Sequence, residues 1–269
     1  MSPAVRIRRA ERADLDALTT LILTSFRQFQ LFAYLYSPLQ TCPISASDTL
    51  WYWRRRLRLE MLDPSTDVLV ADISVADERP DATDDGESKR LHEWVLARRG
   101  QKDPQIRTIG KLGNGGSDGD LNDRLVVGFA IWNLRKPDQG EETESGIISK
   151  RPKQSWAAWL EDQDPKAYTE YTRAEDRLAN QCYSSETVYY LDNLTVDFRF
   201  QRRGIGKELV QKGLKEAARL DLPAMTEASI RGESLYYKMG FEKMAIWDVC
   251  GFRLPVMRWT QPTQTQASH

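Results

Sequence analysis

One stretch in the last third of the chain restricts the possible folds more than any other. Residues 187–196, TVYYLDNLTV, are rich in β-branched and aromatic side chains, which favours a strand. The turn QRRGIG follows at 201–206, and residues 205–220 carry apolar side chains at helical spacing. A glycine-rich turn between a strand and a helix brings free backbone N–H groups and the positive end of the helix dipole to one point. Such a point is a ready site for a phosphate group.

The turn carries three cations, Arg202, Arg203 and Lys207, in a chain whose formal net charge is −1. Without a global basic field, we expect no nucleic acid and no anionic membrane as partners, so anion binding must be local. The turn lacks the third glycine of the dinucleotide fingerprint and the Lys-Ser/Thr pair of the P-loop. On these residues alone, a phosphate site and a plain tight turn remain alternatives.

Composition indicates one large, soluble domain, because 41% of the 269 residues are hydrophobic and 29% are charged; the order of the strands and helices predicted below indicates a mixed α/β fold. The three cysteines are widely spaced and form no CxxC pair, which favours a reducing compartment, so we expect a cytoplasmic protein with the nucleus not excluded. Only two histidines are present, His92 and His269, so triad chemistry and histidine metal sites lack their usual groups. We expect no metal.

The periodicity predicts strands at about 4–9, 67–73, 124–134, 187–196 and 223–228 and over 242–249 and 252–259. Helices are predicted at 15–26, 47–62 and 205–220, with a short helix that ends at Gly240. The run Arg54-Arg55-Arg56 is interpreted as a solvated helix face. Residues 1–260 are expected to form a single domain with insertions at about 76–123 and 135–185, the second partly helical, followed by a polar tail at 261–269.

Two motifs in the right order resemble the acetyl-CoA-binding core of the GNAT superfamily of N-acetyltransferases. The first is Gln201-Arg202-Arg203-Gly204-Ile205-Gly206 after Leu194-Thr195-Val196, and the second is Tyr236-Tyr237-Lys238-Met239-Gly240-Phe241. The resemblance is strong over 187–241, plausible for 4–73 and 124–134, and absent from the insertions; it is greatest to a poorly characterised fungal branch. It implies a mixed α/β sheet and acetyl transfer from acetyl-CoA to an amine, a small molecule more than a protein.

The resemblance also implies roles for individual residues. The backbones of Leu194, Thr195 and Val196 would bind the pantetheine arm, and the turn would hold the pyrophosphate. The cofactor-binding residues of the turn are Gln201, Arg202, Arg203, Gly204, Ile205, Gly206 and Lys207. Three positions depart from the pattern: Phe198 replaces a frequent proline, Arg202 a frequent glycine, and Ser229 an asparagine that often contacts the cofactor.

Acid and base roles are predicted for two further residues. Tyr236 would protonate the departing thiolate, because a phenol has a suitable reference pKa of ~10. An acceptor amine must lose a proton before attack, at a cost of roughly 4–5 kcal/mol for a lysine-like amine at pH 7. Asp192 is the candidate base, expected on the same strand face as Leu194 and Val196; a structural carboxylate paired with an arginine is the alternative for it. Tyr190 and, more weakly, Glu227 are alternative bases.

Other functions stay open on the sequence. The chain could use a different acyl-CoA or a hydroxyl acceptor, or it could be a non-catalytic module that binds CoA or a partner. No cysteine stands at a motif position, which favours direct transfer without a covalent enzyme intermediate. The acceptor's identity and the oligomeric state are not predicted.

Overall fold

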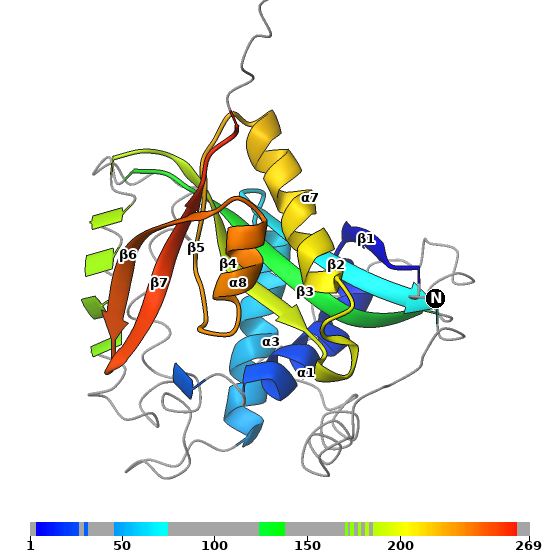
Figure 1. Cartoon of the computed structure of the whole chain (residues 1–269). Coiled ribbons are helices and arrows are strands. Elements are labelled where there is room, and N and C mark those ends of the chain that lie inside the picture. Colours follow the sequence, from blue (N-terminus) through cyan, green and yellow to red (C-terminus); the bar gives the residue numbers. More distant parts are fainter. Residues whose placement is uncertain are drawn as a thin grey trace, which may run out of the picture.

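The fold is organised around a seven-stranded mixed sheet with strand order β1-β2-β3-β4-β5-β7-β6 (Figure 1). A computed structural model describes residues 4–26, 30–31, 46–74, 124–137, 170–171, 173–174, 177–178, 181–182 and 185–262. All strand pairs are antiparallel except β4 with β5. The strands are β1 (Arg6–Arg9), β2 (Thr66–Ser74), β3 (Arg124–Arg135), β4 (Val188–Val196), β5 (Ala224–Glu227), β6 (Glu242–Val249) and β7 (Phe252–Trp259).

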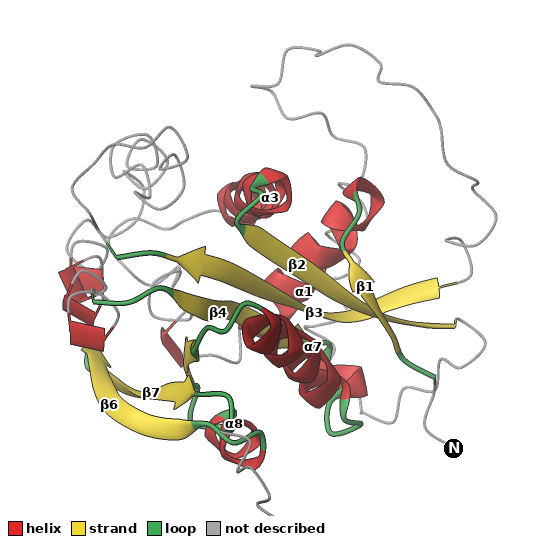
Figure 2. Ribbon diagram, turned by 90° about the horizontal axis from the view of Figure 1, so that it is seen from above, coloured by secondary structure: helices red, strands yellow, loops and turns green. Residues whose placement is uncertain are grey.

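Helices cover both faces of this sheet (Figure 2). On one face lie α1 (Leu15–Phe26) and α3 (Ala46–Leu62), and on the other lies α7 (Ile205–Arg219), with α8 (Glu233–Lys238) beside it. These bounds lie within a few residues of the predicted ones, and the predicted mixed α/β class is confirmed. The face bearing α1 and α3 is called the α3 face below, and the other the α7 face.

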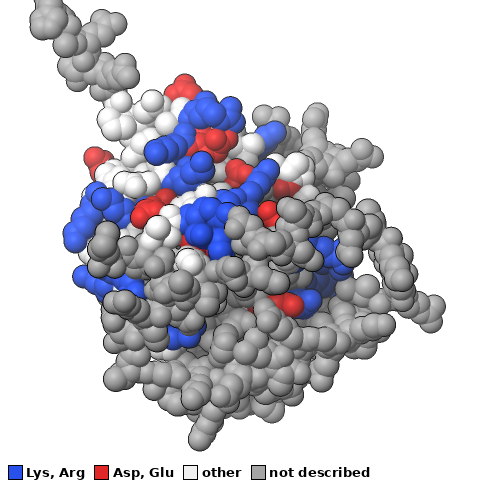
Figure 3. Space-filling model, turned by 90° about the vertical axis from the view of Figure 1, so that its right-hand side faces the viewer, with Lys and Arg blue, Asp and Glu red and all other residues white. Residues whose placement is uncertain are grey.

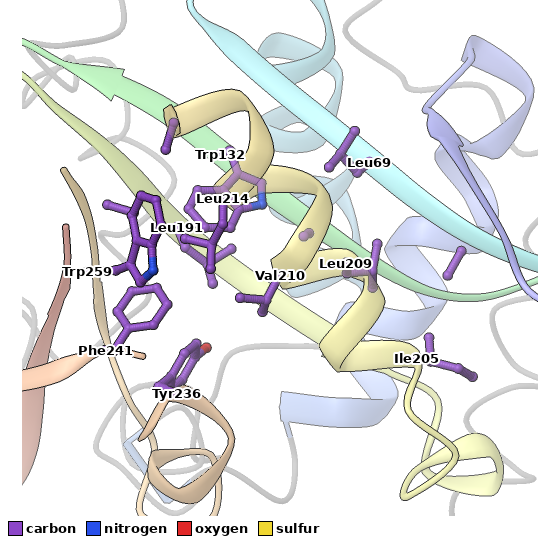
Figure 4. Packing of buried hydrophobic residues seen from close by; sticks show 14 of the residues in the cluster. Leu69, Trp132, Leu191, Ile205, Leu209, Val210, Leu214, Tyr236, Phe241 and Trp259 are labelled. Atoms are coloured by element: carbon purple, nitrogen blue, oxygen red, sulfur yellow. The ribbon is translucent and has the colours of Figure 1, made fainter. Parts of the chain in front are cut away.

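Three clusters of buried side chains hold the layers together. On the α3 face, leucines of α1 and α3 pack on Val68, Val70, Phe129 and Ile131. On the α7 face, α7 and α8 pack on β3 and β4, with Trp132 at the centre (Figure 4). A side chain at Gly213 of α7 would collide with the Trp132 indole, so only glycine lets the helix lie this close to the sheet.

The third cluster lies where residues between 170 and 182 meet β6 and β7. The described residues of this segment are helical, as predicted, and the Trp247 indole N–H donates to the Ala174 carbonyl at 3.0 Å. Most of the two predicted insertions, and the tail from residue 263, lie outside the described residues. The predicted domain boundaries therefore stay a prediction.

A β-bulge in β4 reverses the direction of one predicted site residue. Ile131 of β3 stands opposite Asn193, but the next residue, Trp132, stands opposite Leu191, so Asp192 is the extra residue. Leu191 and Leu194 consequently both belong to the α7 face, whereas Asp192 turns to α3. The prediction that Asp192 shares a face with Leu194 and Val196 is wrong, because simple alternation fails across a bulge.

A buried carboxylate joins the first three strands. Asp72 of β2 has no exposed surface and accepts hydrogen bonds from Arg6 of β1, from Arg8 at 2.8 Å and from Arg124 of β3. Arg8 also binds Asp14, at 2.7 Å, before α1. Burial by itself raises the pKa of Asp72, but the hydrogen bonds from the three arginines outweigh it and lower that pKa below its ordinary value.

Replacing Asp72 by asparagine should lower the free energy of unfolding by about 3–5 kcal/mol, because three guanidinium groups lose their buried counter-charge. The Asp72 carboxylate contributes stability above its unfolded pKa and loses it as the pH falls through its lower folded pKa. The difference between wild type and variant in urea unfolding should therefore shrink in acid. Asp248→Asn is the control, since Asp248 and its partner Arg253 are exposed; equal losses for the two variants would contradict the prediction.

Candidate active site

The parallel strands β4 and β5 separate in the middle of the sheet. They are in register at only two residue pairs in the described chain, Tyr189–Ala224 and Tyr190–Met225. Just beyond these pairs, the Thr226 hydroxyl donates to the Leu191 carbonyl at 3.0 Å. β4 then continues to Val196 without a registered neighbour on this side among the described residues. Its backbone groups there can bind an extended molecule as a further strand would.

The separated part of β4 leads directly to the glycine turn. The Gln201 side-chain amide donates to the Val196 carbonyl at 3.1 Å and closes the turn against the strand end. Gly204 precedes α7 with a φ of +88°, in the left-handed region that glycine adopts without strain. The first helical bond runs from the Glu208 N–H to the Gly204 carbonyl, and no side chain of the described residues is found to cap the helix start. The N–H groups of the first turn therefore lack intrahelical acceptors.

The side chains of the turn have different tasks. Ile205 is buried and anchors the turn in the core. The Arg203 guanidinium lies 5.2 Å from the centroid of the buried Phe200 ring and donates to the Arg199 carbonyl at 3.4 Å. Arg202 and Lys207 are exposed, and Arg202 has a φ of +65°. Position 202 is therefore left-handed, a conformation that glycine adopts without strain. The motif that the sequence resembles often has glycine here, whereas this chain has an arginine.

Tyr236 projects from α8 toward the region between Leu191 and Val210 (Figure 4). It is buried, packs edge-to-face on Phe241, and its hydroxyl hydrogen-bonds with the Thr226 hydroxyl where β4 and β5 separate. Burial raises the pKa of Tyr236 to about 12; the negative charge of Glu227 adds to the rise, and the Thr226 hydrogen bond opposes it. The phenol is therefore protonated at neutral pH and available as a donor.

Ser229 closes the loop before α8. Its hydroxyl accepts from the Gly232 N–H at 3.1 Å, and its carbonyl accepts from the Glu233 N–H at 3.0 Å. The serine therefore has a local role in shaping the turn. Its predicted contact with a cofactor stays a prediction.

Asp192 lies on the α3 face between two arginines. One of its oxygens binds Arg56 of α3 at 2.5 Å and the other binds Arg135 of β3 at 3.3 Å. Both oxygens therefore bind guanidinium groups, which is the structural role that was the alternative for this residue. A catalytic role for Asp192 stays a prediction.

The interpretation of Arg54-Arg55-Arg56 as a solvated face is wrong for Arg56. Its side chain is mostly buried and binds Glu60 at 3.4 Å as well as Asp192. The signal was in the sequence: Trp53, Leu57 and Glu60 recur at helical spacing and are all buried, and Arg56 borders that stripe. Arg135 was predicted as the first residue of the second insertion, and it carried no comparable signal; in the structure it ends β3.

A second carboxylate, Glu227, lies on the same face as Asp192. It ends β5 and accepts a hydrogen bond from the hydroxyl of the buried Tyr190. The Arg135 guanidinium lies 3.2 Å from the centroid of the Tyr190 ring. The α3 face thus brings together Tyr190, Asp192 and Glu227, the three residues predicted as alternative bases.

One further side of the molecule carries described side chains of both charges. Figure 3 shows the side on which β1 lies, where described Lys and Arg side chains are interspersed with Asp and Glu, in line with a net charge of −1. Within the described ranges, no group of three or more His, Cys, Asp or Glu is arranged to hold a metal ion. No helix in the described part of the chain is both long and apolar enough to cross a membrane.

Comparison with known proteins agrees with this geometry. Residues 123–241 match the model of the acetyltransferase (GNAT) family. A search of curated proteins finds no match. The structure resembles arylalkylamine N-acetyltransferase 2 from Aedes aegypti, with a TM-score of 0.51 at 12% identity, over 95% of this chain and 98% of that one.

Two other solved structures are similar at lower TM-scores. A histone acetyltransferase HPA2-related protein from Corynebacterium glutamicum gives 0.49 at 16% identity, over 98% of this chain and 99% of that one. The PaiA N-acetyltransferase from Thermoplasma acidophilum, solved with coenzyme A, gives 0.45 at 12% identity, over 96% and 99%.

The fold and the family match define an acyltransferase enzyme. Within that class, residues 123–241 match the acetyltransferase (GNAT) family model. The expected kinship with a fungal branch stays a prediction.

Replacing Gly204 by alanine should lower the free energy of unfolding by about 1 kcal/mol, because a Cβ is strained at a φ of +88°. Gly251, between β6 and β7, is a matched site: its φ is +78°, and no atom of the described residues lies within 4 Å of a Cβ added at either glycine. Thermal unfolding should show similar losses for Gly204→Ala and Gly251→Ala. A loss confined to one of them would contradict the strain argument.

Proposed function

We propose that the chain transfers the acetyl group of acetyl-CoA directly to an amine, and that the acceptor is a small molecule. One observation carries this proposal: beyond Tyr190, the described chain gives β4 no registered neighbour on its β5 side, and β4 leads through the glycine turn to a helix start whose N–H groups have no intrahelical acceptors. An extended arm that ends in a pyrophosphate satisfies both features at once. The arm pairs with the strand, and the phosphates bind the helix N-terminus.

The turn supplies specific groups for acetyl-CoA. The backbones of Leu194, Thr195 and Val196 would bind the pantetheine amides. The N–H groups from Arg202 to Lys207 would bind the pyrophosphate, aided by the two exposed cations, Arg202 and Lys207. Arg203, which contacts Phe200 and the Arg199 carbonyl, would keep the loop in shape. Gln201 would serve the same end through its bond to Val196.

The separated strands also divide the chemistry between the two faces of the sheet. Tyr236 belongs to the α7-face cluster, where the thiolate would leave. The candidate bases lie on the α3 face, from which the amine would approach. There Tyr190 is buried, and Asp192 has only a small exposed fraction. Such closely set, buried polar groups suit a small amine better than an extended peptide.

The raised pKa of Tyr236 refines its role as the acid. Full transfer of its proton to a thiolate of ordinary pKa ~8.5 would be unfavourable by about 5 kcal/mol. A thiolate in the same buried place also has a raised affinity for protons, which reduces this difference. Tyr236 would therefore act first as a hydrogen-bond donor to the developing thiolate and complete the proton transfer as the carbon–sulfur bond breaks.

Replacing Tyr236 by phenylalanine should lower kcat by roughly 10²–10⁴-fold, as expected for the loss of a general acid, with little change in the KM for acetyl-CoA. Tyr237→Phe is the matched control, because its hydroxyl is exposed and binds Glu233 at 3.2 Å. Release of free CoA thiol is the measurement. Unchanged turnover of Tyr236→Phe at every pH would remove Tyr236 as the acid.

Calorimetry with acetyl-CoA tests the proposal as a whole. The wild type and Gly251→Ala should bind alike, and Gly204→Ala should bind more weakly, because its strain lies in the phosphate turn. A well-folded wild type that does not bind acetyl-CoA would overturn the proposal.

A thiol-release panel of amino acids, polyamines, arylamines, aminoglycosides and peptides then identifies the acceptor. Turnover of peptides alone would contradict the small-molecule acceptor. Binding of acetyl-CoA without transfer to any amine would favour a non-catalytic module, and preference for another thioester or for an alcohol would favour the alternative acyltransferases.

A further inference from the structure

We propose that Glu227, oriented by Tyr190, is the base that takes the proton from the acceptor amine, and that Asp192 positions this pair through Arg135. The inference rests on the proposed function and names the residues that act on its acceptor side. It assigns Asp192 a positioning role in place of the predicted catalytic one.

The Tyr190–Glu227 hydrogen bond lies at the place where the strands divide. Tyr190 is the last residue of β4 in register with β5, and Glu227 is the last residue of β5. The hydroxyl of Tyr190 donates to the Glu227 carboxylate from the neighbouring strand. Because the bond joins β4 and β5 at the start of their separation, the carboxylate is held beside the opening that the acetyl group would occupy.

Arg135 and Asp192 support this pair from β3 and β4. The Arg135 guanidinium lies over the Tyr190 ring, 3.2 Å from its centroid. A cation on an aromatic face draws electron density from the ring and makes the hydroxyl a stronger hydrogen-bond donor. Asp192 binds the same guanidinium at 3.3 Å and thereby holds it in place.

Asp192 itself is poorly suited to accept a proton. Its second oxygen binds Arg56 of α3 at 2.5 Å, so two guanidinium groups share one carboxylate. Protonation would weaken both ion pairs in a largely buried site. The Glu227 carboxylate, by contrast, accepts a hydrogen bond from the Tyr190 phenol at the point where β4 and β5 separate, beside the place proposed for the acetyl group.

The ionisable groups around Glu227 come from several elements. Tyr190 faces it from β4, with Arg135 and Asp192 behind; Cys182 lies within reach of its charge from the 170–182 segment, and Tyr236 from α8. On β7, the residue opposite Glu227 is the apolar Val256, and Arg258 two positions on is paired with Glu186 at 3.0 Å.

The charge of Glu227 links the proposed base to the proposed acid. It raises the pKa of Tyr236, so uptake of a proton by Glu227 removes that contribution. Tyr236 then becomes a better donor at the stage when the thiolate leaves. Deprotonation of the amine by Glu227 and protonation of the thiolate by Tyr236 are thus coupled through the charge of Glu227, without direct contact between the two side chains.

The steps balance as follows. Glu227 takes one proton from the ammonium group, and the nitrogen lone pair attacks the thioester carbonyl carbon. A carbon–nitrogen bond forms and the carbon–sulfur bond breaks, with its electron pair left on sulfur, which receives the proton of Tyr236. The second proton of the nitrogen and the proton held by Glu227 both pass to solvent, and solvent reprotonates Tyr236. Overall, an ammonium ion and acetyl-CoA give an amide, CoA thiol and one proton.

The test compares two amines that differ in their need for a base. Phenethylamine is protonated at pH 7 and must be deprotonated, whereas aniline is already neutral. Glu227→Gln should lower kcat/KM for phenethylamine by roughly 10²–10⁴-fold and leave that for aniline nearly unchanged. Tyr190→Phe should show the same selectivity with a smaller loss. Glu242→Gln, at an exposed site on β6, is the control and should affect neither amine.

Asp192→Asn distinguishes the two assignments of the base. If Asp192 is a positioning residue, Asp192→Asn should lower kcat/KM for phenethylamine less than Glu227→Gln does. A structural defect alone would lower kcat/KM equally for both amines. The ratio of kcat/KM for phenethylamine to kcat/KM for aniline is therefore the decisive measurement. Equal losses for the two amines in Glu227→Gln, or a larger selective loss in Asp192→Asn, would overturn the proposal.

Acetyl-CoA binding is measured on the same samples. Wild-type protein that binds acetyl-CoA but acetylates neither amine would also overturn the proposal. Failure to bind acetyl-CoA at all would instead overturn the proposed function.

Discussion

The short parallel pairing of β4 and β5 is the constraint on which the rest of the site depends. Two residue pairs connect the strands, and beyond these pairs the described residues of β4 and β5 are no longer in register with each other. The hydroxyls of Thr226 and Tyr236 gather on the α7 side of the fork, and the Tyr190–Glu227 bond on the α3 side. A longer pairing would satisfy the backbone of β4 internally and leave no place for a ligand in the sheet.

The local features of this arrangement could be predicted from the sequence. Strand, glycine turn and helix follow one another within residues 187–220, and their patterns depend on neighbours a few positions away. The buried Tyr236 and the left-handed Gly204 stand where the motifs placed them. The helix start, the strand end and the order of the elements needed no knowledge of distant contacts.

The acceptor side could not be predicted in the same way, because it depends on contacts between residues far apart in the chain. Arg56 and Asp192 are 136 positions apart, and Tyr190 and Glu227 are 37 apart. The face of Asp192 depends on a bulge, which strand alternation cannot show in advance. Three candidate bases therefore remained on the sequence. Only the folded arrangement shows that Asp192 binds two guanidinium groups and that Glu227 accepts a hydrogen bond from Tyr190.

The close approach of Gly213 to Trp132 has a consequence for the proposed ligand site at the start of the same helix. The indole sets how closely α7 approaches the sheet, and a rigid helix carries that spacing along its length to its first turn. A larger residue at position 213 would raise the whole helix, and the N–H groups at its start would move away from the end of β4. A buried glycine and tryptophan thus set the distance between the strand end and the helix start, and with it the length of the ligand proposed to bind both.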